Sequence, residues 1–154
     1  MIKITRITAQ KNAERFNIFI DNGNGEEFGF GVDQDVLIEW NLKKGLELTD
    51  TEITEIKAAD DVKKAFNQSL LFLSYRMRSQ KELVDYLKKK EYQIDTIQKV
   101  IQKLMNYDYI NDQAFAKAFV QSKKSTTMKG PNILKQELFQ KGISKDIISD
   151  TVGQ

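Results

Sequence analysis

Clusters of lysine, arginine and hydroxyl side chains are the residues of this sequence most suited to binding chemistry. No acid occurs between Asp112 and Glu137. This acid-free stretch carries Lys117, Lys123, Lys124, Lys129 and Lys135, interleaved with Ser122, Ser125, Thr126 and Thr127. The first basic cluster along the chain consists of Arg76, Arg78 and Lys81, and the lysines of the acid-free stretch form the second. Ammonium, guanidinium and hydroxyl groups bind phosphate oxygens, so the two clusters predict a surface for nucleic acid or for an acidic protein. The alternative is a merely solvated surface.

The residue types that carry most enzyme chemistry are missing. The sequence contains neither histidine nor cysteine. Their absence removes the commonest general base, the commonest metal ligand and the usual nucleophile pairs. A magnesium site made of carboxylates would need acids clustered in a pocket, and no spacing suggests one. We therefore expect a non-catalytic protein without a cofactor, and rank a small carboxylate enzyme last among the alternatives.

Charge is distributed unevenly along the 154 residues. The net charge is +2 over residues 1–25, −8 over residues 26–61 and +8 over residues 62–154. Such asymmetry favours different partners for the two ends of the chain. No apolar run is long enough to span a bilayer, and the first residues lack the apolar core of a signal peptide. We expect a cytoplasmic monomer with no membrane partner.

The first 32 residues have the pattern of a small antiparallel sheet. Polar and apolar side chains alternate over residues 3–8, and β-branched and aromatic residues follow over 15–20. Residues 21–25, Asp-Asn-Gly-Asn-Gly, suit a hairpin turn, and residues 26–32 suit the returning strand. These glycines lack the spacing of a phosphate-binding loop, so the hairpin is the preferred interpretation.

From Asp33 onward the pattern is helical. Asp33 is a candidate cap for a short helix that packs Trp40 onto the sheet, and residues 49–52 form a capping box for a long helix. We expect this helix to run to Arg76 with a break near residues 58–61. The caps expected for the later helices are Ser79, Asp95, Asn111 or Asp112, Gly130 followed by Pro131, and Ser144. Residues 122–129 suggest a loop or a frayed end.

The helical part contains an internal repeat with an offset of 51 residues. At this offset Leu83 aligns with Leu134, and Ile97 with Ile148. Other aligned pairs are Leu87 with Leu138, Lys90 with Lys141, Asp95 with Asp146, Ile101 with Val152, Ala65 with Ala116 and Met77 with Met128. The prediction is mainly α: tandem three-helix repeats preceded by a small antiparallel β-sheet with a packed helix. The expected domains are residues 1–61, 62–110 and 111–154.

Three blocks of sequence resemble the RecX family. Residues 75–83, Tyr-Arg-Met-Arg-Ser-Gln-Lys-Glu-Leu, are similar to its first block, and Leu87 follows at the family's spacing. Residues 109–116 are similar to its helix-junction block. Gly130-Pro131 together with residues 137–143 is similar to its third block. The resemblance runs in register over residues 65–152, and the N-terminal segment looks like the extension found in RecX proteins of low-GC Gram-positive bacteria.

The resemblance implies a regulator rather than an enzyme. RecX proteins lie in the groove of the filament that RecA forms on single-stranded DNA, and they inhibit strand exchange and ATP hydrolysis. The expected partners are therefore the RecA filament and its single-stranded DNA. The runner-up function is a DNA-binding helical module unrelated to RecA. A helix-turn-helix ranks lower still, because no helix is rich in Arg, Asn and Gln.

Two further expectations concern the tyrosines and the end of the chain. Tyr75, Tyr107 and Tyr109 are candidates for base stacking, although packing at helix junctions is the preferred interpretation. The resembled family usually has three three-helix repeats, whereas this chain shows two. We therefore expect a fragment in which an apolar patch near the C-terminus, formed by Ile143, Ile147, Ile148 and Val152, is either exposed or covered by a second copy of the chain.

Overall fold

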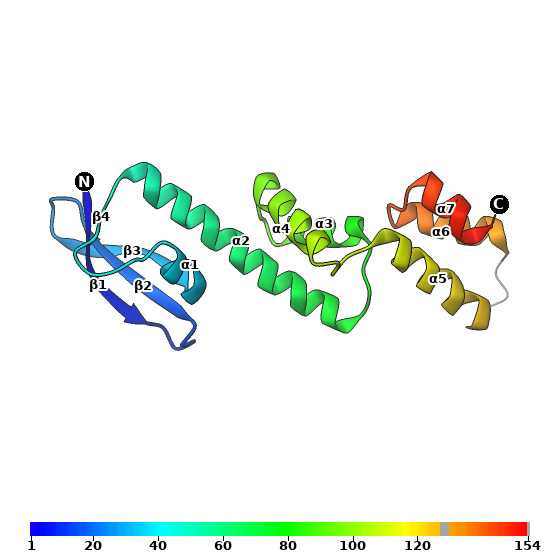
Figure 1. Cartoon of the computed structure of the whole chain (residues 1–154), viewed down its shortest axis with the longest axis horizontal. Helices are drawn as coiled ribbons and strands as arrows, with labels where there is room; N and C mark the ends of the chain where they lie inside the picture. The colour runs from blue at the N-terminus through cyan, green and yellow to red at the C-terminus, as the bar shows by residue number, and fades with distance from the viewer. Residues whose placement is uncertain (127–129, 154) are drawn as a thin grey trace. The chain divides into compact units, whose positions relative to one another are not determined.

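The computed structural model of the protein describes residues 1–126 and 130–153, with the side chains of all of these except 124–126. The chain divides into two compact units, Met1–Lys64 and Ala65–Gln154. The first unit holds the sheet and the second holds the helical repeats (Figure 1). The predicted fold class is confirmed.

The first unit contains a four-stranded antiparallel sheet. Its strands are β1 (Ile2–Ala9), β2 (Arg15–Asp21), β3 (Glu26–Asp33) and β4 (Glu47–Leu48), in the order β3-β2-β1-β4. The predicted three-strand meander is confirmed. The fourth strand was not predicted, because two residues are too few to show an alternating pattern.

The hairpin between β2 and β3 forms at the predicted glycines. Gly23 and Gly25 have φ values of +112° and +100°, which only glycine adopts readily. The Asp21 carboxylate accepts hydrogen bonds from both of their backbone N–H groups, at 2.7 and 3.2 Å. The turn is therefore stabilised by the Asp21 side chain, and no phosphate-binding role is needed to explain its glycines.

A short helix, α1 (Gln34–Glu39), closes one side of the first unit. Asp33 caps it as predicted, accepting a hydrogen bond from the Asp35 N–H at 2.8 Å. Trp40 ends α1 and packs, half-buried, against the hydrophobic core. That core is formed by Ile4, Ile18, Phe30, Val32, Val36, Leu42, Leu48, Ile53 and Ile56.

The long helix α2 (Asp50–Tyr75) is continuous, so the break expected near residues 58–61 was a wrong prediction. The helix begins with the predicted capping box, in which Thr49 and Glu52 each bond the other's backbone N–H. Its interior contains no glycine or proline. The acid at the expected break, Asp60, is buried and bound by Arg15 at 3.0 Å, so it is accommodated within the helix.

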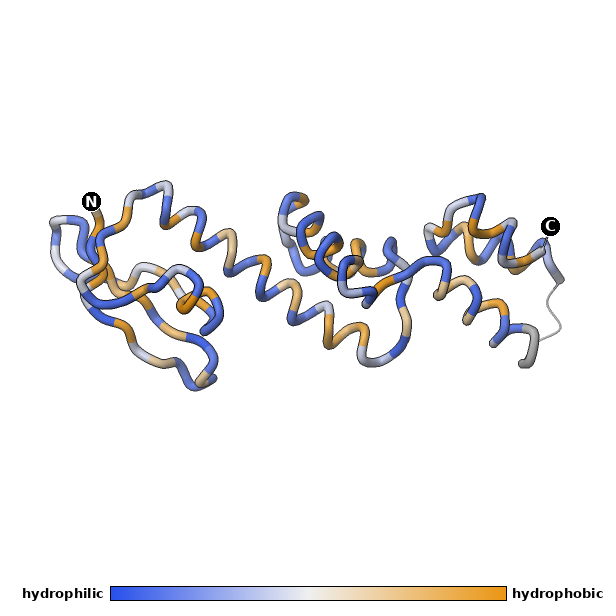
Figure 2. The backbone as a smooth tube through the Cα atoms, viewed as in Figure 1, coloured by the Kyte–Doolittle hydropathy of each residue, from blue (hydrophilic) through white to orange (hydrophobic). Residues whose placement is uncertain are grey.

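The internal repeat is visible in the helix boundaries. The helices are α3 (Gln80–Lys89), α4 (Ile94–Asn106), α5 (Asp112–Thr126), α6 (Pro131–Gln140) and α7 (Lys145–Val152). At the 51-residue offset, α3 coincides with α6 at both ends, α4 and α7 begin together, and α5 ends where α2 ends. In Figure 2, apolar and polar stretches alternate along these helices, as expected of repeats that bury one face.

Most of the predicted helix caps are confirmed. Ser79 forms a complete capping box with Glu82, Ser144 caps α7, and Pro131 occupies the first turn of α6. Asn111 caps α5 by accepting from the Ala114 N–H at 3.1 Å. The expected cap Asp95 is wrong: α4 begins at Ile94, and its cap position is Gln93, two residues before Asp95. The end expected at 122 is also wrong, because α5 continues to Thr126.

The apolar residues near the C-terminus pack within their own repeat. Ile143 and Ile148 are buried in a cluster with Phe115, Leu134 and Leu138. Ile147 and Val152 lie partly buried against the same cluster. The exposed patch expected from these four residues is therefore not formed, because the second repeat supplies enough apolar surface to cover them.

The Asp60 carboxylate is the main polar contact in the first unit. It accepts two hydrogen bonds from Arg15, and it accepts the backbone N–H of Asp33 at 2.8 Å. Replacing Asp60 with Ala should lower the free energy of unfolding of this unit by about 3 kcal/mol, because a half-buried guanidinium and a buried N–H lose their acceptor. Fluorescence of Trp40, the single tryptophan, measures this in urea. The exposed neighbour provides the control: Asp61→Ala should change the value by less than about 0.5 kcal/mol. Equal urea midpoints for the two variants would refute the role of Asp60.

Candidate functional site

Hydrogen bonds from Ser79 and Gln80 join the first repeat to the second. The Ser79 hydroxyl, which is buried, donates to the backbone carbonyl of Lys141 at 2.7 Å. The Gln80 N–H donates to the Asp112 carboxylate at 2.9 Å. Burial raises the pKa of Asp112, and the Gln80 N–H partly offsets that effect. The N-terminus of α3 is thus fixed against the end of α6 and the start of α5.

Gly142 allows this close approach. Its φ is +82°, and a Cβ at this position would overlap the side chain of Lys81. Any larger residue would therefore push the two repeats apart.

The Glu82 carboxylate connects residues on both sides of the junction. It accepts the Ser79 N–H at 3.0 Å, and it forms ion pairs with Arg76 at 2.8 Å and Lys141 at 3.4 Å. Burial opposes ionisation of Glu82, but the Arg76 and Ser79 hydrogen bonds and the Lys141 charge outweigh it and lower the pKa to about 2. Glu82 is therefore charged at neutral pH.

The first predicted cluster is largely engaged in intramolecular contacts. Arg76 is bound to Glu82, and Lys81 forms an exposed ion pair with Asp85 at 3.2 Å. The Arg78 guanidinium lies 3.8 Å from the centre of the Phe72 ring. Burial and the neighbouring Arg76 charge lower the pKa of Arg78. Arg76 and Arg78 thus also hold the end of α2 against α3.

The second predicted cluster is distributed over α5 and α6. Lys117 is exposed on α5, and Lys135 is half-buried on α6. The Lys123 ammonium lies 5.4 Å from the centre of the Phe119 ring. The side chain of Lys124 and the whole of Lys129 lie outside the described residues.

A hollow of about 440 Å³ lies between the two repeats. Arg76 and Met77 line it from the first repeat, and Phe119, Ser122 and Lys141 line it from the second. The Lys141 ammonium lies 5.9 Å from the Phe119 ring centre. The structure therefore brings Arg76 and Lys141 together. Lys141 was missing from the predicted site, although its alignment with Lys90 in the repeat could have drawn attention to it.

The three candidate tyrosines are exposed. Tyr107 stacks on Tyr109, with ring centres 5.5 Å apart, and its other ring contact is Phe66 at 6.3 Å. Each of the three, Tyr75 included, is more than half exposed. The packing expected of them is therefore only partial.

The described residues contain neither a metal-ligand cluster nor a membrane-spanning helix. No group of three or more histidine, cysteine, aspartate or glutamate side chains in residues 1–126 and 130–153 is placed to hold a metal ion. Within the same ranges, no helix has the length and apolar character needed to cross a membrane.

The chain matches three family models over most of its length. Residues 2–49 match the N-terminal domain of the regulatory protein RecX. Residues 65–104 and 111–152 match its first and second three-helix domains. The last two matches fall on the two repeats.

Relatives and solved structures agree with these matches. Regulatory protein RecX of Bacillus velezensis is 53% identical over 150 residues, covering 97% of this chain and 56% of that protein. The Bacillus subtilis protein is 52% identical and is covered to 55%. A crystal structure of regulatory protein RecX matches the whole chain and 74% of its own, at 36% identity and a TM-score of 0.82. RecX from Lactobacillus salivarius matches 61% of each chain at 38% identity and a TM-score of 0.60. The chain spans a little over half the length of the curated relatives.

Replacing Glu82 with Gln should weaken the repeat junction in a pH-dependent way. Because the folded-state pKa is about 2 and the ordinary value is 4.5, ionised Glu82 contributes stability above pH 4.5, and this contribution is lost as pH falls towards 2. Wild type should exceed the variant by about 2 kcal/mol in free energy of unfolding at pH 7, and the difference should vanish near pH 2. Urea titrations followed by circular dichroism measure both values.

The control for this experiment is Asp85→Asn, which breaks the exposed pair with Lys81. It should cost less than about 0.5 kcal/mol at pH 7. A Glu82→Gln effect as small as this, or one independent of pH, would contradict the role of Glu82.

Proposed function

Because this chain belongs to the RecX family of regulatory proteins, we propose that it binds the RecA filament on single-stranded DNA and inhibits the recombinase. The family supports a regulatory role, and the resemblance in the three sequence blocks supports RecA as the partner. As a regulator, the protein acts without catalysis or a cofactor, as a monomer in the cytoplasm, where the filament forms.

The observation that carries this proposal is the acid-free stretch from 113 to 136. It places five lysines in the second repeat, with no acid inside the same stretch of sequence. Phosphate contacts by lysine supply most of the sequence-independent affinity for nucleic acid. We therefore assign the DNA contacts chiefly to Lys117, Lys123, Lys124, Lys129 and Lys135.

The joined repeats support the same proposal in another way. Ser79, Gln80 and Glu82 fix one repeat against the next, so the basic residues are carried on one preorganised array. A rigid array loses less conformational freedom on binding than a flexible one, which favours affinity for an extended filament. Segment 26–61, with its net charge of −8, is unsuited to phosphate and is assigned no DNA contact.

The function is tested by adding the protein in substoichiometric amounts to RecA hydrolysing ATP on single-stranded DNA. The hydrolysis rate should fall, because a bound regulator stops filament growth or turnover beyond the subunits that it touches. An unchanged rate together with binding to bare DNA would support the runner-up, a DNA-binding module unrelated to RecA, and would overturn the proposal.

The role of the lysines is tested by neutralising Lys123, Lys124 and Lys129 to Gln. Filament affinity should fall about tenfold, and the slope of log affinity against log salt should become shallower by about 2, since each lost contact to a single strand contributes about 0.7. Co-sedimentation with filaments at several salt concentrations measures both. The matched control, Lys43, Lys44 and Lys57 to Gln, removes the same charge from segment 26–61 and should leave the slope unchanged. Similar slopes for the two triple variants would mean that the basic stretch serves only solvation.

A further inference from the structure

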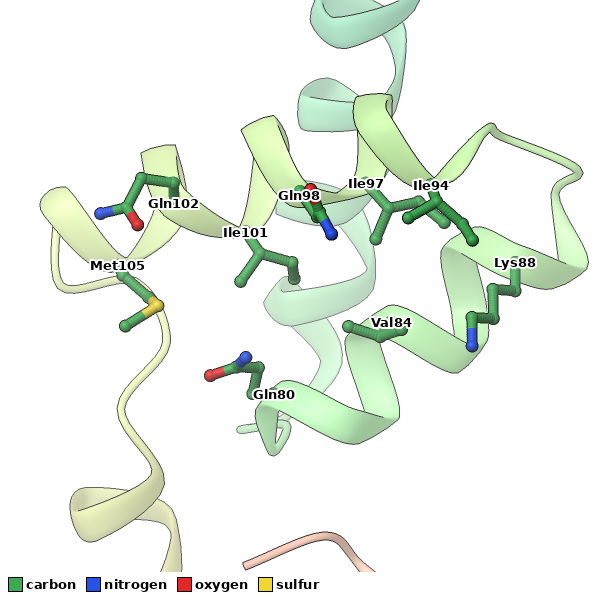
Figure 3. Close-up of a pocket in the computed structure, with 9 residues that line it drawn as sticks. All are labelled: Gln80, Val84, Lys88, Ile94, Ile97, Gln98, Ile101, Gln102 and Met105. Atoms are coloured by element: carbon green, nitrogen blue, oxygen red, sulfur yellow. The ribbon is translucent and has the colours of Figure 1, made fainter.

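An apolar groove runs between α3 and α4 in the first repeat. It encloses about 440 Å³, and its apolar lining consists of Val84, Ile94, Ile97, Ile101 and Met105. Figure 3 shows these side chains on the two helices that border the opening. Ile94 is 63% exposed and Met105 is 46% exposed, so the groove presents aliphatic surface to solvent. Exposed aliphatic surface in a concave site is typical of a binding site.

The packing of the repeat does not require this groove. At the 51-residue offset, Val84 corresponds to Lys135 and Ile94 corresponds to Lys145. The second repeat forms the same pair of helices with lysine at both positions. The aliphatic side chains of Val84 and Ile94 are therefore not required for folding of the three-helix unit.

The two ends of the groove differ in charge. Lys88 lines the end beside Ile94, and the exposed Lys89 and Lys90 follow it at the end of α3. At the other end, Gln80 and Met105 also line a second hollow of about 400 Å³. That hollow contains two carboxylates, Asp108 and Asp112. The groove thus has a basic end, an aliphatic floor and an acidic end.

We propose that this groove, defined by the residues lining it on α3 and α4, docks a short amphipathic helix of the recombinase; the inference rests on the proposed function. Gln80 and Lys88 are eight residues apart, which corresponds to about 12 Å or two turns of a docked helix. Two or three aliphatic side chains at helical spacing fill the floor. An acidic residue of the partner lies at the Lys88 end and a basic residue lies at the Asp112 end.

The lining chemistry selects a protein rather than DNA. Strand-tracking sites combine several cations with aromatic rings for base stacking. The described lining of the groove has one cation, Lys88, and no aromatic ring. Its amides, Gln80, Gln98 and Gln102, suit the polar rim that surrounds an aliphatic anchor in protein interfaces. The lysines of the second repeat and the groove of the first thus face different components of one filament.

The test replaces two groove residues of the first repeat with lysine, the residue found at the equivalent positions of the second repeat. Val84→Lys with Ile94→Lys should weaken binding of the whole chain to RecA filaments on single-stranded DNA at least tenfold, even though the added charge favours DNA. Ile94→Ser, at an exposed position and without added charge, should weaken binding several-fold and leave the salt slope unchanged. The control Phe139→Ser removes an exposed apolar side chain from α6 and should stay within twofold of wild type. Circular dichroism confirms that each variant is folded.

The outcomes separate this inference from the proposed function. If the wild type binds filaments and the groove variants bind equally well, the docking proposal is overturned and the proposed function is not. Failure of wild type to bind filaments overturns both proposals. An equal loss of affinity for a bare oligonucleotide would identify the groove as a DNA site, and a change in self-association by sedimentation would identify the occupant as a second copy. Either result overturns the proposal of a docked recombinase helix.

Discussion

The arrangement of the two repeats depends on the contacts of the Glu82 carboxylate. It completes the capping box of α3, and it also binds a cation from each repeat, Arg76 and Lys141. A carboxylate with three donors stays ionised even though it is partly buried. The same carboxylate therefore caps the start of α3 and holds the two repeats together.

These ion pairs engage several cations that a binding partner would otherwise contact. Arg76, Lys81 and Lys141 all have acidic partners within the second unit, and Arg78 packs on Phe72. A cluster that looks like a binding surface in the sequence is therefore chiefly an internal joint. Lys117, by contrast, is exposed on α5. Whether a basic residue is available for binding therefore depends on the acidic side chains near it in the fold.

Local features of the fold were predictable, whereas long-range pairs were not. The Ser79 box, the Gly130-Pro131 start and the 51-residue offset are each visible within a few residues, because capping and helix periodicity act over one or two turns. Asp60 looked like a helix break because its partner, Arg15, lies 45 residues away. Lys141 escaped the predicted site for the same reason, since it meets Glu82 across 59 residues. The apolar groove was missed because its floor had the spacing of an ordinary helix core.

Gly142 also determines against which helix–helix turn α3 can pack. The position 51 residues earlier is Glu91, whose φ is also positive, at +68°, but which carries a Cβ. A side chain there would collide with Lys81 if another α3 were to dock on the first repeat as α3 docks on the second. Head-to-tail contacts between similar repeats tend to continue into open fibres unless something stops them. The difference between one glycine and one glutamate therefore favours a single order of the two repeats and opposes the same contact between two molecules.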